Sequence, residues 1–323
     1  GDLLEATAHY LEHQWNDGVV TAEPTYGKDG VKTFTCSVCQ TTKTEPIPAP
    51  TPVASGKCGD DLTWALYEDG LLSITGTGTM YGFPISDGSA STPWYSHRNE
   101  IKTIQIGDGA TNIGYAAFFN CSSLTSITIP KGVTSIGYYA FDECSSLTSV
   151  TIPEGMTSIG YSAFFNCSSL TNVTIPDDVM SIGQSAFEGC SGLTSITIPK
   201  GVTKIDSWVF QNCSNLASVT IPEGVISIED SAFCGCISLA SVTMSGSVTS
   251  IGVSAFSGCT SLEDVYYSAT KADWNNITIS DGNKPLIRAT KHYAPTPVAF
   301  SGICGDNLTW TLYVDGLLSI TGT

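Results

Sequence analysis

The sequence predicts an α+β, mainly β fold: a right-handed solenoid in which repeats of 23 residues each add a strand to a parallel sheet. In most repeats a short alternation of apolar and polar residues precedes a proline, which is typical of a strand and its end. Three residue types also recur in register, and a fixed period of this length indicates units that bury one another by stacking. The recurring residues are Cys121, Cys144, Cys167, Cys190, Cys213, Cys236 and Cys259, then Phe118, Phe141, Phe164, Phe187, Phe210, Phe233 and Phe256, and Leu124, Leu147, Leu170, Leu193, Leu216, Leu239 and Leu262.

The strand of one repeat is Ile127-Thr128-Ile129, and Pro130 ends it because proline has no N–H for the ladder. Successive strand residues point to opposite faces, so the two isoleucines face inward and Thr128 faces outward. The Ile-Gly, Ala-Phe and Cys positions then follow at spacings of three to four residues. This spacing predicts a short helical or 3₁₀ turn with an inward face.

A hairpin is predicted before the solenoid, because an Asp-Gly turn separates Leu62–Tyr67 from Leu71–Thr75. This hairpin could cover the apolar end of the first repeat. Trp94-Tyr95 takes the Ala-Phe place of that repeat and Arg98 takes the Cys place, so the repeat is degenerate, as a capping repeat should be. We expect six segments: 1–48, a small N-terminal module with a Cys-x-x-Cys motif; 49–54, a linker; 55–100, the N-terminal cap; 101–267, the solenoid; 268–296, the C-terminal cap; and 297–323, a truncated second copy of the cap motif.

The string Leu-x-x-Ile-x-Ile-Pro-x-x-Val-x-x-Ile-Gly-x-x-Ala-Phe-x-x-Cys resembles the BspA-like leucine-rich repeats of bacterial surface proteins. The resemblance covers residues 101–267, and blocks at 13–48 and 55–76 look like partners of this family in gut Firmicutes. It implies a leucine-rich-repeat solenoid in a secreted or wall-attached protein, and several such proteins are regarded as adhesins. Later repeats depart from the pattern at Asp206 and Glu229 in place of Gly, Val209 in place of Ala, and Met244-Ser245 in place of Ile-Pro.

Charge and hydropathy exclude several partners. The net charge is −17, whereas nucleic-acid binding needs a basic surface and an anionic membrane surface would repel the chain. No run of 18 apolar residues is present, so we expect no membrane span. The chain starts at Gly1-Asp2 and stops inside a repeated motif, so we expect a piece of a longer protein with any secretion signal or wall anchor outside it. We expect a monomer.

Most of the twelve cysteines belong to the repeat, where we predict buried, reduced thiols, with disulfides as the alternative. Cys36 and Cys39 are different, because two thiolates at this spacing, with His13 and with His9 as a further candidate, could hold a structural zinc ion. A metal ion or a disulfide would help a module of about 48 residues without an evident core to fold. A Cys36–Cys39 disulfide and free thiols remain open as alternatives, and no other cofactor is expected.

The predicted binding surface is aromatic. Tyr115, Tyr138 and Tyr161 recur at 23 residues in the turn after Ile-Gly, so we expect them to stack into a stripe on one edge. Exposed tyrosines of this kind suit contacts with proteins or sugars, although they could instead pack against neighbouring repeats. Three further aromatic residues complete the candidate binding site: Trp208, Phe119 and Phe165.

No enzyme is predicted, because none of the four histidines lies in a nucleophile–base motif. We predict an extracellular or cell-wall-attached binding protein, an adhesin for host or bacterial surface proteins or glycans. The alternative is a structural spacer or an accessory domain of a larger cell-wall protein.

Overall fold

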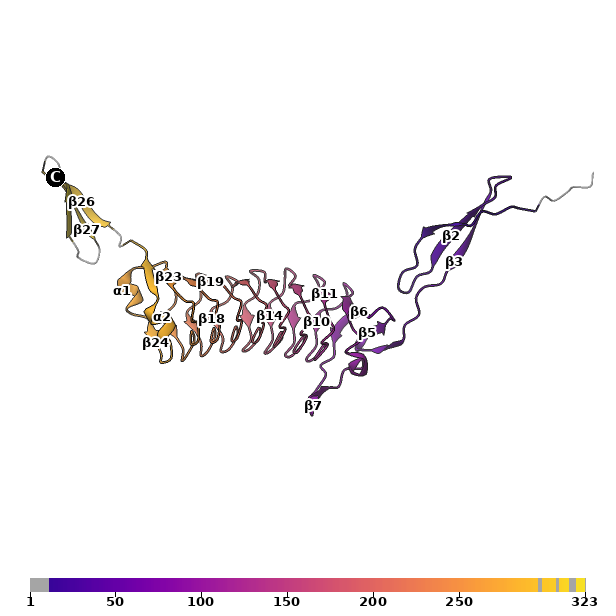
Figure 1. The fold of residues 1–323 in the computed structure, drawn as a ribbon, viewed down its shortest axis with the longest axis horizontal. Coiled ribbons are helices and arrows are strands. Elements are labelled where there is room, and N and C mark those ends of the chain that lie inside the picture. The colour runs from indigo at the N-terminus through magenta and orange to yellow at the C-terminus, as the bar shows by residue number, and fades with distance from the viewer. Residues whose placement is uncertain (1–11, 296–297, 306–307, 314–317, 323) are drawn as a thin grey trace, which may run out of the picture. The chain divides into compact units, whose positions relative to one another are not determined.

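The computed structural model describes residues 12–295, 298–305, 308–313 and 318–322 (Figure 1). The chain divides into two units, Gly1–Ala54 and Ser55–Thr323. Within the second unit, the tail strands form a sheet of their own.

The first unit is a three-stranded antiparallel sheet of β1 (Val19–Ala22), β2 (Gly30–Thr35) and β3 (Thr42–Ile47), with β2 in the centre. β2 and β3 pair along their whole length, from Gly30 opposite Ile47 to Thr35 opposite Thr42. Among the residues described here, only Gly30 and Cys36 are buried. Side-chain packing therefore contributes little to the stability of this unit.

The second unit begins with three strands, β4 (Ala54–Lys57), β5 (Gly59–Leu66) and β6 (Leu71–Met80). β5 and β6 form the antiparallel hairpin expected from the sequence, and Gly70 provides the positive φ of 90° in its turn. β6 then pairs in parallel with β9 (Thr103–Ile106), so the hairpin continues the sheet of the solenoid. Between them lie the short strands β7 (Ile85–Ser86) and β8 (Ser89–Ala90) and a 3₁₀ turn, Tyr95–His97.

The first coil is closed by Trp94, which corrects the expectation that Tyr95 takes the Phe position. The indole of Trp94 is fully buried and stacks on Phe118 with ring centroids 5.7 Å apart. Its Nε1 donates to the carbonyl oxygen of Ala117 at 2.9 Å. In later coils the equivalent carbonyl oxygen accepts from a backbone N–H of the preceding coil, as Ala140 does from Phe118. The indole of Trp94 thus fills this position with both a large ring and a donor, and Tyr95 is left half-buried at the periphery.

Each coil contributes one strand to a long parallel sheet and one to a second, shorter row. The long sheet runs from the cap strands through β9, β11 (Ser126–Thr128), β13 (Ser149–Thr151), β15 (Asn172–Thr174), β17 (Ser195–Thr197), β19 (Ser218–Ile221), β21 (Ser241–Met244), β23 (Asp264–Tyr267) and β25 (Thr290–Tyr293). The second row is β10 (Asn112–Ile113), β12 (Ser135–Ile136), β14 (Ser158–Ile159) and β16 (Ser181–Ile182), then β18 (Lys204–Ile205), β20 (Ser227–Ile228), β22 (Ser250–Ile251) and β24 (Thr278–Ile279). This arrangement is the parallel β-solenoid with 23-residue coils that the sequence predicts.

The segment after the second strand is not the helical turn expected from the apolar spacing. Its residues form a chain of turns, because two residues of most coils adopt positive φ, as Tyr139 (57°) and Glu143 (61°) do. Alternate backbone N–H groups then point along the solenoid axis, so the N–H of Phe141 bonds the carbonyl oxygen of Ala163 in the next coil. The backbone is satisfied between coils rather than within a helix.

The core consists of ladders of identical side chains. The seven phenylalanine rings are fully buried and stack face to face, with centroids 5.1 to 5.8 Å apart. The thiol of Cys144 donates to the carbonyl oxygen of Phe118 at 3.2 Å, and each later cysteine of the ladder repeats this bond. Burial raises the pKa of these thiols, and all of them are free, which agrees with inert, hydrogen-bonded cysteines.

The last coil contains α1 (Lys271–Trp274) and α2 (Lys284–Arg288), and both sheet rows continue through it to β24 and β25. The buried side chain of Asn283 closes this end of the core. Its Oδ1 accepts from the N–H of Phe256 at 2.9 Å, where a further coil would supply a carbonyl oxygen. In the described residues, neither helix has the length and apolarity to cross a membrane.

The tail forms a three-stranded antiparallel sheet of β26 (Val298–Gly305), β27 (Leu308–Tyr313) and β28 (Leu318–Gly322). Its sequence repeats that of β4, β5 and β6, and its topology is the same. Asp306 and 315–317 of the repeated motif lie outside the described residues.

Replacement of Phe187 by Ala should destabilise the solenoid by about 3–5 kcal/mol, because it leaves a cavity in a fully buried stack of rings. Urea denaturation followed by circular dichroism measures the change. The control is Val253→Ala, since Val253 is 49% exposed, and we expect a change within about 0.5 kcal/mol. Equal effects of the two substitutions would contradict a core that depends on the phenylalanine ladder.

Candidate functional site

Tyr115, Tyr138, Tyr139 and Tyr161, from three consecutive coils, form a tyrosine cluster. The ring of Tyr139 lies 5.6 Å from that of Tyr115 and 5.2 Å from that of Tyr161, edge to face in both cases. Tyr138 lies 6.4 Å from Tyr161 and is 58% exposed, while the other three are half-buried. The predicted stripe is therefore linked through Tyr139, which the 23-residue spacing does not single out.

Tyr139 occupies a turn position with a left-handed backbone, φ 57°, where the coils on either side carry Ala116 and Ser162. A bulky residue is uncommon in this conformation, which the other coils adopt at the same turn position with Ala, Ser or Trp. Burial among the neighbouring rings, with the hydroxyl of Tyr161 alongside, raises the pKa of Tyr139 to about 12. The phenol is therefore neutral at physiological pH and available as a hydrogen-bond donor or acceptor.

A groove of about 610 Å³ lies beside the tyrosine cluster along the second row of strands. Tyr138 and Tyr161 line it, and Ser135, Ser158 and Ser181 lie along it on strands β12, β14 and β16. Met180, 66% exposed, adds an apolar contact. The remaining polar side chains of the groove are Gln184, Thr203, Lys204 and Asp206, and the last two form an ion pair at 3.1 Å.

The groove coincides with a break in the second row of strands between β16 and β18, which we call the seam. In the preceding coils a Cβ on Gly160 or Gly183 would lie 2.7 Å from a backbone carbon of the coil before it. Asp206 carries a Cβ at this position. In the neighbouring coils the N–H of this position bonds the isoleucine carbonyl oxygen of the coil before, but the N–H of Asp206 does not bond Ile182. Glu229 makes the same replacement one coil later, but its N–H still bonds the carbonyl oxygen of Ile205.

The other predicted binding residues do not join the tyrosine cluster. Trp208 is 39% exposed and repeats the position of Tyr139 three coils later, roughly 15 Å away at about 4.8 Å per strand. Phe119 and Phe165 are half-buried and flank Asp142 at the same position of successive coils. Burial raises the pKa of Asp142 to about 7, with a smaller effect from the Glu143 charge. A carboxyl group therefore interrupts the apolar patch expected there.

The predicted metal ligands of the first unit come together. The ligand atoms of His13, Cys36 and Cys39 all lie within 4.8 Å of one another, and His13 Nδ1 is 3.2 Å from Cys39 Sγ. The backbone N–H of Cys39 lowers the pKa of Cys36 to about 6, in opposition to burial. His9, the further candidate, lies outside the described residues.

Two more histidines pair with carboxylates. His97 Nδ1 lies 3.1 Å from Glu100 Oε2 in the N-terminal cap. His292 Nε2 lies 2.7 Å from Asp264 Oδ1 on the long sheet, and its ring stacks on Tyr266 at 4.6 Å. Both pairs are partly exposed to solvent.

A family model described as BspA type Leucine rich repeat region, in six copies, matches residues 92–217 and 157–281, more than half of the chain. Among solved structures, a leucine-rich repeat protein from Eubacterium ventriosum is 26% identical, with a TM-score of 0.42 over 67% of this chain and 72% of that one. One from Bacteroides ovatus is 25% identical, with a TM-score of 0.49, and the match spans 69% of this chain and 66% of that one. A leucine rich cell surface protein from Faecalibacterium prausnitzii is 23% identical, with a TM-score of 0.32 over 70% and 97% of the two chains. No curated protein matches the chain significantly.

The raised pKa of Asp142 makes folding stability depend on pH. The folded state keeps a proton that the unfolded state releases above its ordinary pKa of about 3.9, so the free energy of unfolding falls as pH rises from about 4 to about 7. Asp142→Asn removes this loss. Its melting temperature should exceed that of the parent increasingly across this window and by a constant amount above it. The exposed Asp108→Asn is the control, and parallel profiles for all three proteins would exclude a buried, neutral carboxyl at 142.

Proposed function

The chain belongs to the BspA-type leucine-rich-repeat family, and on that premise we propose that it is an extracellular, cell-surface-associated binding protein, an adhesin. We assign ligand contact to the tyrosine cluster and the adjoining groove. The observation that supports this assignment is their continuity, since Tyr138 and Tyr161 belong to the cluster and also line the groove.

The chemistry of this surface suits recognition without catalysis. Tyrosine offers a large apolar area and a hydroxyl while losing little conformational entropy on binding. The cluster holds its rings edge to face before any ligand arrives, which lowers the ordering cost of association. Serine hydroxyls, Gln184 and the Lys204–Asp206 pair provide donors and acceptors beside the rings. A protein loop or a glycan on a host or bacterial surface matches this combination of aromatic and polar groups.

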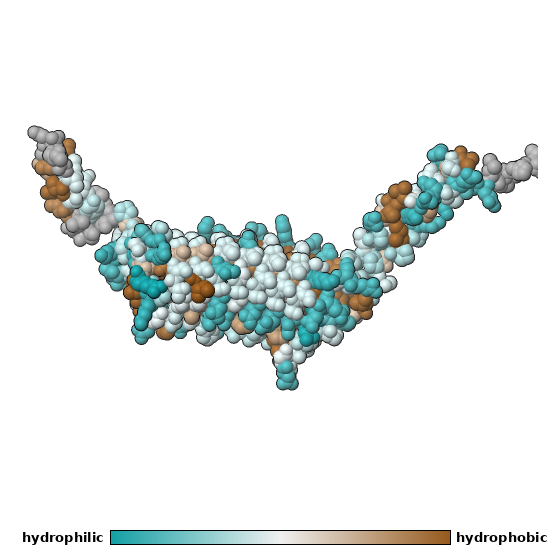
Figure 2. All heavy atoms as spheres, in the orientation of Figure 1, coloured by the Kyte–Doolittle hydropathy of each residue, from teal (hydrophilic) through white to brown (hydrophobic). Residues whose placement is uncertain are grey.

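The long sheet supports the competing role of a spacer. Its outward side chains Thr128, Thr151, Thr174 and Thr197 are exposed, small and uncharged, and their row stabilises the sheet without offering an anchor. Figure 2 shows much of one solenoid face in the pale colours of weakly hydrophilic residues. A spacer that binds nothing would need no more than the outward face of the long sheet.

Capture of a ligand should require the tyrosine cluster. The test is a screen of the full chain against mucin, matrix proteins and a glycan array, repeated with Tyr138→Ser, Tyr139→Ser and Tyr161→Ser combined. Other coils carry Ser at these turn positions, as at Ser207 and Ser162, so the fold should be kept. Loss of one aromatic anchor costs about 2 kcal/mol, so we expect capture to weaken by about thirtyfold or more.

Tyr266→Ser is the matched control, because Tyr266 is 46% exposed on the long sheet, away from the groove. Capture of protein ligands alone or of glycans alone would identify the partner class. Undiminished capture by the triple variant would refute the site, and an absence of any saturable binding by the parent would favour the spacer.

A further inference from the structure

In the loop that follows β2 in the first unit, backbone hydrogen bonds hold the two cysteines of the Cys-x-x-Cys motif in place. The N–H of Cys36 bonds the carbonyl oxygen of Thr41, and the N–H of Gln40 returns to the carbonyl oxygen of Cys36. Gln40 has a positive φ of 60°, which reverses the chain at once after Cys39. These bonds hold the two cysteines on one tight turn between β2 and β3.

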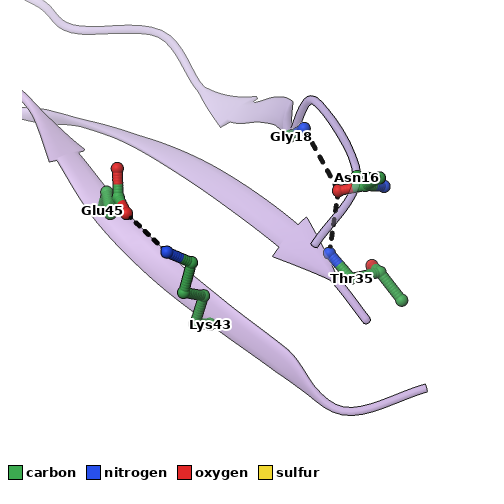
Figure 3. A network of polar contacts seen from close by, with 5 residues as sticks. All are labelled: Asn16, Gly18, Thr35, Lys43 and Glu45. Carbon is green, nitrogen blue, oxygen red and sulfur yellow. Dashed lines mark hydrogen bonds and ion pairs between the residues drawn. The ribbon is translucent and has the colours of Figure 1, made fainter. Parts of the chain in front are cut away.

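A second segment brings the histidine to this turn. Trp15 forms a bridge with Cys36, and the Oδ1 of Asn16 accepts from the N–H of Gly18 at 3.1 Å and from the N–H of Thr35 at 2.9 Å (Figure 3). Asn16 thereby ties the segment that carries His13 to the end of β2. The imidazole of His13 also packs on Trp15, with ring centroids 4.9 Å apart.

The separations fit a metal centre. In a tetrahedral zinc site with Zn–S of about 2.3 Å and Zn–N of about 2.0 Å, neighbouring ligand atoms lie about 3.5–3.8 Å apart. His13 Nδ1 is 3.2 Å from Cys39 Sγ, and the three ligand atoms lie within 4.8 Å of one another. Small side-chain rotations are enough to reach the tetrahedral spacing.

The first unit also needs such a centre. Cys36 is the only apolar or thiol side chain buried among the residues described in this unit, and the exposed side chains of Val19 and Val20 contribute no core. Three short strands without a core are marginal in water, and bound zinc adds its binding free energy to folding. Two soft thiolates and an imidazole favour zinc over calcium or magnesium, which prefer oxygen ligands.

We propose that His13, Cys36 and Cys39 bind a zinc ion that holds the first unit folded. Because His13 and Cys39 are exposed, solvent can reach the ion and supply a fourth ligand. The role is independent of ligand capture by the solenoid, because all three ligands belong to the first unit.

The test measures metal content in the reduced full chain after equilibration with zinc and removal of the excess. We expect about one zinc ion per chain, close to none in Cys39→Ser or His13→Ala, and retention in His13→Cys, which replaces one zinc ligand by another. Cys304→Ser is the matched control, since Cys304 is an exposed, free thiol in the tail sheet. Cobalt in place of zinc should give the charge-transfer absorption of thiolate ligands in the same variants.

Hydrogen exchange separates a structural role from incidental binding. Chelation should accelerate exchange in β2 and β3 and leave the solenoid strands unchanged. Zinc retained by Cys39→Ser, no zinc in the reduced parent, or equal exchange with and without metal would overturn the proposal. So would a purified chain whose intact mass shows a Cys36–Cys39 disulfide that excludes zinc.

Discussion

The whole solenoid depends on register between identical coils. One coil has two short strands and a chain of turns, and its isoleucine, phenylalanine, leucine and cysteine side chains are buried only when the same residues lie above and below them. Backbone hydrogen bonds follow the same rule, because alternate N–H groups of the turn that carries Phe141 bond carbonyl oxygens of the next coil. Side-chain burial and backbone satisfaction are thus one constraint, and a residue that shifts one coil against the next disturbs both.

The two ends of the stack show how this constraint is met where a neighbour is missing. Trp94 supplies a ring and an N–H at one end, and Asn283 supplies an acceptor at the other. In each case a side chain takes over a hydrogen bond that the backbone of a further coil would have made. The first unit has no such stack, and its stability has to come from local bonds such as those of Asn16 and from the cysteine turn.

The period of 23 residues was enough to predict the parallel sheet, the inward face and the buried cysteine ladder, since these depend only on residues that recur. What the sequence could not predict lies at positions where one coil differs from the rest. Tyr139 follows a recurring tyrosine and stands where most other coils carry Ala or Ser, so the spacing gave it no weight, yet its ring links the cluster. Asp206 was visible as a departure from glycine, but the break beside it depends on a backbone approach of a few ångströms. The burial of Trp94 in place of Tyr95 depends on its stacking with Phe118 and its hydrogen bond to Ala117, which appear only in three dimensions.

The seam also governs how the solenoid can bend. Elsewhere two rows of strands join neighbouring coils, whereas at the seam the long sheet continues from β15 to β17 and the second row is interrupted. The widest spacing of the phenylalanine ladder, 5.8 Å between Phe187 and Phe210, occurs at the same place. We therefore expect bending to be easiest at the seam, where the long sheet and turn bonds such as that from the N–H of Phe187 to the carbonyl oxygen of Val209 still join the coils. A molecule held by Tyr161 on one side of the seam and by Lys204 on the other would stiffen the rod, so occupancy and elasticity would be coupled.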